Sequence, residues 1–435
     1  MATKKKLLQV SGGGEDYWIA LLGGSSSDTG YEISADSGNN IIVVGVTGSA
    51  GAGSNDLLTA KYDASGTLLW SKAYGNTASD SAYRVVIDSS DNIISAGAYN
   101  DLSSTEGIVV KYNSAGTLQW ARSLGRSTGE VFYGVAVDSS DNIYATGYTN
   151  HGTAGYEVLV AKYNSSGTLQ WQRKMGASSN DYGRSASVDS SGNIIISGYT
   201  TSFGQGGTEA LLVKLNSGGT ILWVRSLGNT STDAFFHATV DSSDNIIAVG
   251  RSIQDSYYET IVAKYSSSGN LLWIKALSDT GTAADYGYNV VTDSSDNICI
   301  VAFTRAYDSG FNEPIIAKFN SSGTLLMQKR LGGTNNDAGY GIGVDLNDNI
   351  LVTGYTQSDG AGNNDIFVAK LPPDGSGDGT YGSLTYQDAT LTVSTPGVTS
   401  SAQTITSNTA SNTSSSLSVT ETTLALTEEL FVVTP

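Results

Sequence analysis

One unit of about 50 residues recurs along most of the chain, and this repeat constrains the fold more than any other feature. All six tryptophans stand in one register of the unit, and a seventh copy carries methionine there: Trp18, Trp70, Trp120, Trp171, Trp223, Trp273 and Met327. Every copy also carries an aspartate: Asp36, Asp88, Asp138, Asp189, Asp241, Asp293 and Asp345. Every copy carries a lysine as well: Lys61, Lys111, Lys162, Lys214, Lys264, Lys318 and Lys370.

Each unit contains four short apolar stretches, for example 83–88, 142–147, 157–163 and 220–225. Asp-Ser-Ser-Asp-Asn or a variant separates the first two stretches, and Ser-Ser-Gly-Thr or a variant separates the last two. Both sequences are typical of tight turns, because Asn and Gly tolerate positive φ while Asp and Ser bond to nearby amides. No sustained helical periodicity occurs, so each unit is predicted to be a four-stranded sheet.

The two ends of the repeat region predict how the fold closes. The chain begins with a lone fourth strand around Trp18, and its last copy stops after a third strand that ends near Lys370. The N-terminal strand can therefore complete the last sheet and leave no incomplete blade. We predict an all-β fold, a seven-bladed β-propeller over residues 16–372, preceded by an N-terminal segment at 1–15.

The units resemble the seven-bladed β-propeller repeat (SBBP-type) found in many bacterial and phage-associated surface proteins. The resemblance rests on 162–171, on Gly176, on Asp-Ser-Ser-Gly-Asn-Ile at 189–194 and on Gly-Tyr-Thr at 198–200, and it covers roughly residues 16–372. It implies the propeller fold. It says little about function, because propellers carry many unrelated activities.

The composition changes after Leu371. A linker rich in proline, glycine and aspartate is predicted at 373–382, followed by a Ser/Thr-rich arm at 383–435. The arm has no Lys or Arg, and its segments 383–394 and 416–426 have the pattern of strands. A polar arm of this kind cannot easily build its own core, so we expect it to add strands to a partner or to copies of itself. The alternative is a disordered tail.

Charge and cysteine content exclude several classes of partner. The net charge of −18 disfavours nucleic acid and anionic membranes, and no apolar run is long enough to span a bilayer. The single cysteine, Cys299, rules out an internal disulfide and is interpreted as a small buried residue. The N-terminus lacks the apolar core of a signal peptide, so export by the general secretory route is not expected.

The loops between the second and third strands differ from unit to unit, and variable loops on a repeated scaffold are the usual place for recognition. They are rich in aromatic residues, which can stack on sugars. We take as candidate ligand-binding residues Tyr148, Tyr156, Tyr199, Phe203, Tyr257, Tyr258, Tyr307 and Phe311.

Two sets of acidic residues recur near the same loops. One precedes the first strand: Asp28, Asp80, Glu130, Asp181, Asp233, Asp285 and Asp337. The other opens the third strand: Asp56, Glu106, Glu157, Glu209, Glu259, Glu313 and Asp365. These carboxylates either cap loops and pair with neighbouring basic residues, or bind cations or sugar hydroxyls.

Signatures of catalysis are sparse. The two histidines, His151 and His237, lie in different units, and no phosphate loop or nucleophile motif occurs. Sialidases are also propellers, but the turn at 164–171 lacks the aspartate of their repeated box. We therefore predict no catalytic residues, no metal site, no cofactor and a non-enzymatic protein.

Two functions fit these features. The first is a structural or adhesion component of a tailed-phage virion, such as a tail, fibre or surface-decorating protein. In that role the arm contacts other virion proteins or copies of itself, and the propeller contacts a host surface glycan. The alternative is a bacterial carbohydrate-binding, lectin-like propeller located at the cell surface or outside the cell.

Overall fold

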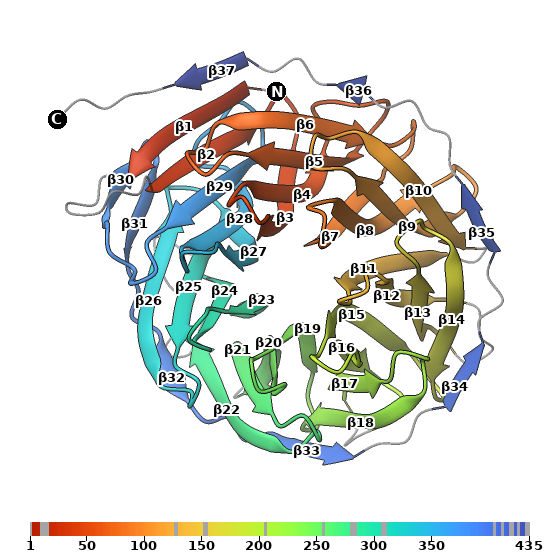
Figure 1. Ribbon diagram of the computed structural model, residues 1–435. Coiled ribbons are helices and arrows are strands. Elements are labelled where there is room, and N and C mark those ends of the chain that lie inside the picture. Colours follow the sequence, from red (N-terminus) through yellow and green to blue (C-terminus); the bar gives the residue numbers. More distant parts are fainter. Residues whose placement is uncertain are drawn as a thin grey trace. The chain divides into compact units, whose positions relative to one another are not determined.

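A computed structural model of the chain describes residues 2–8, 17–125, 129–150, 155–203, 207–254, 257–278, 285–305, 311–402, 406–409, 413–416, 422–423 and 427–430. Within these ranges all regular elements are β-strands, arranged in seven sheets (Figure 1). The fold is a seven-bladed β-propeller of four-stranded antiparallel blades, as the repeat predicts. In the ranges given, no helix is present that could cross a membrane.

The chain divides into two compact units. The first comprises Met1–Val85, Thr282–Thr392 and Val419–Pro435. It holds three blades: β3 (Asp28–Ala35), β4 (Ile41–Thr47), β5 (Asp56–Tyr62) and β6 (Leu68–Tyr74); β23 (Tyr286–Thr292), β24 (Ile298–Thr304), β25 (Glu313–Phe319) and β26 (Leu325–Gly332); β27 (Asp337–Val344), β28 (Ile350–Thr356), β29 (Asp365–Leu371) and β2 (Tyr17–Gly23).

The second unit comprises Val86–Gly281 and Val393–Ser418. One of its sheets includes β7 (Ser81–Ile87), within which the boundary between the units falls. Its blades are β7 with β8 (Ile93–Asn100), β9 (Thr105–Tyr112) and β10 (Leu118–Gly125); β11 (Glu130–Val137), β12 (Ile143–Thr149), β13 (Glu157–Tyr163) and β14 (Leu169–Gly176); β15 (Asp181–Val188), β16 (Ile194–Thr200), β17 (Glu209–Leu215) and β18 (Ile221–Gly228); β19 (Asp233–Val240), β20 (Ile246–Gln254), β21 (Tyr257–Tyr265) and β22 (Leu271–Ser278).

The first and last strands of the repeat region share one blade. β2 pairs antiparallel with β29, with Trp18 opposite Lys370 and Leu22 opposite Ile366. This confirms the predicted closing strand. A further strand within the predicted N-terminal segment, β1 (Ala2–Leu8), pairs with the outer side of β2.

The recurring aspartate and lysine form an ion pair across their blade. Lys61 Nζ lies 2.7 Å from Asp36, and the Asp36 carboxylate also accepts a hydrogen bond from the Asn40 amide at 2.8 Å. Burial would raise the pKa of Asp36, but the hydrogen bonds from Lys61 and Asn40 hold it below its usual value. Equivalent pairs, at 2.7 to 3.5 Å, join Asp88 to Lys111, Asp189 to Lys214, Asp241 to Lys264, Asp293 to Lys318 and Asp345 to Lys370.

The recurring tryptophan joins neighbouring blades within a unit. Trp120 Nε1 donates to the Ser165 carbonyl in the following blade at 3.3 Å. Gly167 lies in that same turn with φ of +77°, and a Cβ atom there would come within 2.8 Å of the Trp120 ring. Glycine is therefore required twice, for its positive φ and for the close approach of the indole.

The second aspartate of the Asp-Ser-Ser-Asp-Asn turn also joins blades. Asp141 has φ of +58°, and its carboxylate accepts hydrogen bonds from Ser89 N at 3.0 Å and from Ser89 Oγ at 2.7 Å. Asp244 and Asp348 accept in the same way from Ser190 and Ser294. This turn thus holds consecutive blades together.

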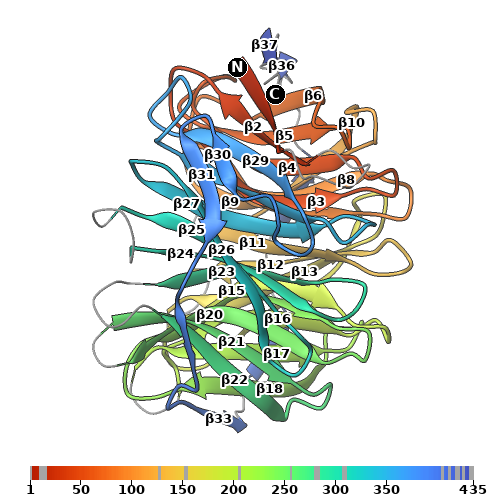
Figure 2. The same cartoon turned by 90° about the vertical axis from the view of Figure 1, so that its left-hand side faces the viewer.

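The C-terminal arm places its strands on the outer edges of the chain's own blades. β31 pairs with β26, β33 with β18, β34 with β14, β35 with β10 and β36 with β6. β32 extends the sheet of β22, β37 pairs with β1, and β30, inside the predicted linker, pairs with β31 (Figure 2). The arm strands are β30 (Gly379–Tyr381), β31 (Leu384–Asp388), β32 (Thr392–Ser394), β33 (Thr399–Ala402), β34 (Thr406–Thr409), β35 (Thr413–Ser416), β36 (Thr422–Thr423) and β37 (Thr427–Leu430).

The predicted addition of strands is therefore observed, but on this chain's own propeller, which the sequence did not lead us to consider. Apart from β30, which pairs with β31, each described arm strand meets the outer strand of a sheet rather than forming a core of its own. The use of the arm by other proteins or by further copies stays a prediction.

Candidate ligand-binding site

A β-bulge recurs in the first strand of the blades, and it determines where one side chain per blade points. In β11, β15 and β19 the pairing register shifts around Tyr133, Arg184 and Phe236, which leaves these residues opposite no single partner. A bulge re-aims the side chain of the extra residue and is common beside functional sites. The same shift occurs around Tyr31, Tyr288 and Tyr340 in the first unit.

In the second unit the bulged residues contact one another through an arginine. The guanidinium carbon of Arg184 lies 4.1 Å from the ring centroid of Tyr133 and 5.6 Å from that of Phe236. Arg251, on β20, lies 5.5 Å from Phe236 and 4.4 Å from Tyr258. These distances are those of cation–π contacts, so two positive groups are placed against three aromatic faces.

Four tyrosines from β12, β15, β16 and the segment before β13 extend this group. Tyr182 lies at their centre, with ring centroids 5.3 Å from Tyr148, 5.2 Å from Tyr156 and 4.7 Å from Tyr199. Tyr148 also lies 5.0 Å from Tyr156 and 5.9 Å from Tyr133. The aromatic–arginine cluster thus consists of Tyr133, Tyr148, Tyr156, Tyr182, Arg184, Tyr199, Phe236, Arg251 and Tyr258.

Arg184 differs from Arg84, Arg225 and Arg330 in its partners. Within the described ranges its guanidinium has ring contacts and no hydrogen bond or ion pair. Arg84 instead pairs with Glu32 and Arg330 with Glu313. Arg225 donates to the carbonyl of Val224 in its own strand and to that of Gly269 in a turn of the following blade. A guanidinium stacked on rings still presents its N–H edge, which suits a planar anion.

The hydroxyls of Tyr182 and Tyr199 remain protonated at neutral pH. Burial, followed by the neighbouring tyrosines, raises the pKa of Tyr182 to about 12. Burial also raises the pKa of Tyr199, and the charges of Arg184 and Arg251 oppose this shift only in part. The cluster therefore offers hydroxyl donors and acceptors together with positive charge.

The structure brings together four of the eight candidate residues, namely Tyr148, Tyr156, Tyr199 and Tyr258. Phe203 packs against a hydrophobic core instead, and Tyr257 is 43% exposed at the start of β21. Phe311 lines a cavity in the first unit, and Tyr307 lies outside the described residues. Sequence reasoning missed Tyr133, Tyr182, Arg184, Phe236 and Arg251. The signal for three of these was an arginine and two aromatics at one repeat position, but the bulge that re-aims them cannot be read from that pattern.

The acidic residues that precede the first strand cap loops. Asp28 accepts from Gly24 N at 3.0 Å and from Ser49 Oγ at 2.6 Å, and Asp181 accepts from Ala177 N at 2.9 Å and Ser202 Oγ at 2.7 Å. In the second set, Glu157 pairs with Lys174 at 2.6 Å and Glu313 with Arg330 at 3.1 Å. For these residues the structure supports the loop-capping and ion-pairing interpretation. Across the described ranges, His, Cys, Asp and Glu form no group of three or more that could hold a metal ion.

Family models match parts of the chain. The model "Beta-propeller repeat" matches residues 119–152 and 329–361, and a model for a β-propeller domain of unknown function matches residues 347–381. The chain is therefore a β-propeller repeat protein. It is also 25% identical over 297 residues to an uncharacterized WD repeat-containing protein of Acanthamoeba polyphaga mimivirus. That match covers 56% of this chain and 19% of the relative, so the chain spans about a fifth of the relative's length.

Solved structures with the same fold include enzymes. The periplasmic gluconolactonase of Pseudomonas aeruginosa is 10% identical with a TM-score of 0.48, over 79% of this chain and 98% of that one. A glucose dehydrogenase is 9% identical with a TM-score of 0.38, over 81% and 99%. These structures correct the prediction of a non-enzymatic protein. That prediction took the absence of familiar catalytic motifs in a propeller as evidence against catalysis. Both likenesses concern the fold.

Proposed function

We propose that this chain is a recognition propeller that binds an acidic carbohydrate through the aromatic–arginine cluster. The observation that carries the proposal is the position of Arg184, whose guanidinium lies against Tyr133 and Phe236 without a carboxylate partner among the described residues. Its free N–H edge suits the carboxylate of a uronic acid, since arginine binds carboxylates in a planar, two-bond geometry.

The tyrosines supply the rest of such a site. Ring faces accommodate the apolar face of a sugar, and the protonated hydroxyls of Tyr182 and Tyr199 supply hydrogen bonds that orient it. The chain's net charge of −18 repels an acidic ligand at long range. Binding therefore depends on the local arginines, and we expect it to be lost when their charge is removed.

The experiment is calorimetric titration of the full chain with tri-galacturonate and with its methyl ester, which lacks the carboxylates. We expect the acidic sugar to bind, and Arg184→Gln to weaken binding at least about tenfold. Arg173→Gln is the matched control, because Arg173 also stacks on a ring, that of Trp171 at 5.5 Å, but belongs to the repeat scaffold. Equal affinity for the acidic sugar and its ester would contradict the proposal.

We further propose that the protein is displayed on a tailed-phage virion, with a bacterial surface or extracellular lectin as the alternative setting. The arm favours the virion. Each sheet ends on an arm strand, and such edge strands can pair with strands of other virion proteins or of further copies. Mass photometry of the full chain tests this: defined oligomers are expected, and a monomer at every concentration would count against assembly through the arm.

A further inference from the structure

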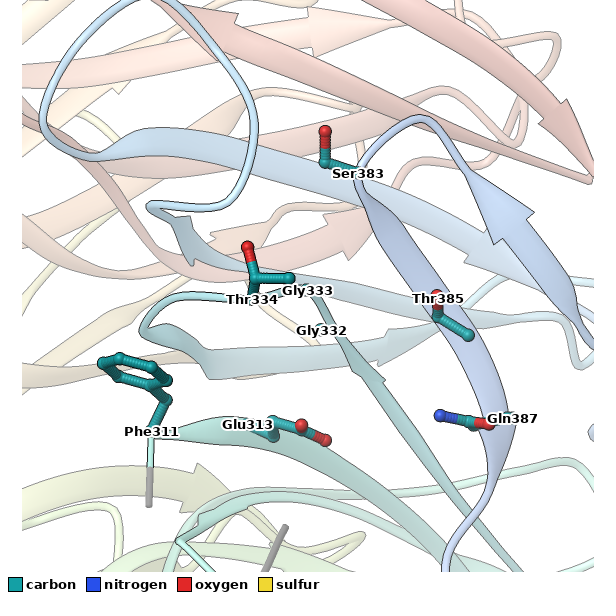
Figure 3. Close-up of a pocket in the computed structure, with 8 residues that line it drawn as sticks. All are labelled: Phe311, Glu313, Gly332, Gly333, Thr334, Ser383, Thr385 and Gln387. Atoms are coloured by element: carbon teal, nitrogen blue, oxygen red, sulfur yellow. The ribbon is translucent and has the colours of Figure 1, made fainter. Parts of the chain in front are cut away.

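A cavity of about 370 Å³ lies where the arm meets a blade of the first unit (Figure 3). Its walls come from the segment before β25, from the start of β25, from the end of β26 and from β31 of the arm. They are formed by Phe311, Glu313, Gly332, Gly333, Thr334, Ser383, Thr385 and Gln387.

Strand alternation explains why the arm turns polar groups toward this cavity. Leu384 and Tyr386 of β31 are buried in a hydrophobic core, so the intervening residues face the other side of the strand. These are Thr385 and Gln387, and they line the cavity together with Ser383 from the turn before β31. β31 pairs with β26, and Thr385 lies opposite Gly332. This register fixes the position of the β31 side chains along the cavity wall.

The ion pairs of β26 hold the arm strand in place. Lys329 Nζ lies 2.7 Å from Asp378, which precedes β30, and 2.6 Å from Asp388, the last residue of β31. Gly333 permits the close approach of the arm, because a Cβ atom there would lie 2.4 Å from the Ser383 carbonyl oxygen. These ion pairs and this close backbone approach therefore fix the arm strand that forms one wall of the cavity.

The charge in the cavity is neutralised by a chain of contacts. Arg330 Nη1 lies 3.1 Å from Glu313 Oε2. The Gln387 amide, turned so that its oxygen faces Arg330, accepts from Nη2 at 2.5 Å and from Nε at 2.9 Å. The cavity thus presents one carboxylate whose charge is balanced by arginine, and uncharged groups from Thr334, Ser383, Thr385 and Gln387.

Phe311 supplies the apolar surface. Its ring is 37% exposed, and Figure 3 shows it on the opposite side of Glu313 from Gln387. An aromatic face opposite a set of hydroxyl and amide groups, in a cavity of this volume, suits a small polyhydroxylated ligand without net charge.

We propose that this cavity is a second binding site, which takes a neutral monosaccharide, and that β31 and the turn before it supply three of its four uncharged polar side chains. The proposal is independent of the acidic-sugar site, since the two share no residue. It assigns the arm a role in ligand binding, because the blade without β31 would keep only Phe311, Glu313, Thr334 and the two glycines of the wall.

The test is saturation-transfer NMR of the full chain with D-glucose, D-galactose, D-mannose and N-acetylglucosamine, each at millimolar concentration. We expect at least one of these sugars to bind. Phe311→Ala and Gln387→Ala should each weaken that binding about tenfold or more. Thr392→Ala, on β32 of the same arm but outside the cavity, is the matched control and should bind as the unmodified chain does. Bound sugar should also slow amide exchange in β31, because it bridges the arm and the blade.

Three results would overturn the proposal. The first is failure of all four sugars to bind the unmodified chain. The second is unchanged binding in Phe311→Ala and Gln387→Ala. The third is loss of neutral-sugar binding in Arg184→Gln, which would place the sugar in the aromatic–arginine cluster. Because Arg184→Gln leaves this cavity intact, failure of the acidic-sugar proposal and failure of this one give different patterns across the variants.

Discussion

Charged residues at or beside the bulge of the first strand have different partners in the two units. In the first unit Glu32 is buried next to bulged Tyr31, and it accepts hydrogen bonds from Arg84 Nη1 and Asn289 Nδ2, both at 2.8 Å. In the second unit Arg184 itself is the bulged residue and contacts aromatic rings alone among the described residues. The charge of Arg84 is thus used within the fold, whereas that of Arg184 is available to a ligand.

A glycine makes the contacts of Glu32 with Arg84 and Asn289 possible. A Cβ atom on Gly341 would lie 2.7 Å from the Glu32 Cα, so glycine lets the strands approach closely enough for Glu32 to reach Asn289. Burial raises the pKa of Glu32, and the charge of Arg84 opposes that shift only in part. Two neighbouring positions of the repeat therefore differ in use: the residue after the bulge stabilises the fold in the first unit, whereas we propose that the bulged residue Arg184 serves recognition in the second.

The largest effect is expected when the hydrogen bonds that Glu32 accepts in the first unit are removed. Glu32→Ala leaves Arg84 and Asn289 buried without their shared acceptor, so we expect a loss of about 3 kcal/mol in the free energy of unfolding. Urea unfolding followed by circular dichroism measures it. Glu157→Ala is the control, because its partner Lys174 is more exposed and the expected loss is below about 1 kcal/mol. Equal losses in the two variants would contradict the structural role of Glu32.

The complementary change in the second unit should affect binding more than stability. Arg184→Gln removes a charge that has no carboxylate partner within the described ranges, together with its ring contacts, so we expect the free energy of unfolding to fall by no more than about 1 kcal/mol. Binding of tri-galacturonate should fall at least about tenfold. A large loss of stability with unchanged binding would assign Arg184 to the fold, like Arg84.

The aspartate–lysine pairs predict an acid-sensitive fold in both units. Burial would raise the pKa values of the paired aspartates, but hydrogen bonds hold these values below the usual 3.8. This applies to Asp36, Asp88, Asp189, Asp241 and Asp293. A carboxyl with a lowered folded-state pKa stabilises the fold above its unfolded pKa, and this stabilisation is lost as the pH falls through the folded value. Melting temperature should therefore fall steeply below pH about 4. A flat profile down to pH about 2 would contradict the role of these pairs.

The smallest effect concerns Asp56 in the first unit. Burial and the nearby charge of Asp80 raise its pKa to about 6. The folded chain then binds this proton more tightly than the unfolded chain, so Asp56 costs stability at high pH and the cost disappears as the pH falls from about 6 to about 4. Asp56→Asn should raise the melting temperature by about 2 °C at pH about 8 and leave it unchanged at pH about 4. A destabilised variant at both pH values would show that the carboxylate is needed by its loop.

The sequence predicts the fold well because the repeat encodes local structure directly. Gly167 and its equivalents indicate the turns, Trp18 and Lys370 predict the closing strand, and the register of both is observed. The site is predicted less completely, because its geometry depends on the bulges. Alternation places Arg184 in a strand, but the bulge that directs it toward Tyr133 arises from pairing with β16. The cavity beside Phe311 could not be predicted either, since Gln387 reaches it only through the pairing of β31 with a strand far away in sequence.

We propose that Arg184, unlike Arg84, contacts an acidic sugar. The most direct test is NMR of the full chain labelled with ¹⁵N-arginine, in which the side-chain Nε–H resonances are followed during titration with tri-galacturonate. We expect the Arg184 resonance to shift until binding saturates, while the Arg84 resonance does not shift. No shift at Arg184, or equal shifts at both arginines, would contradict it.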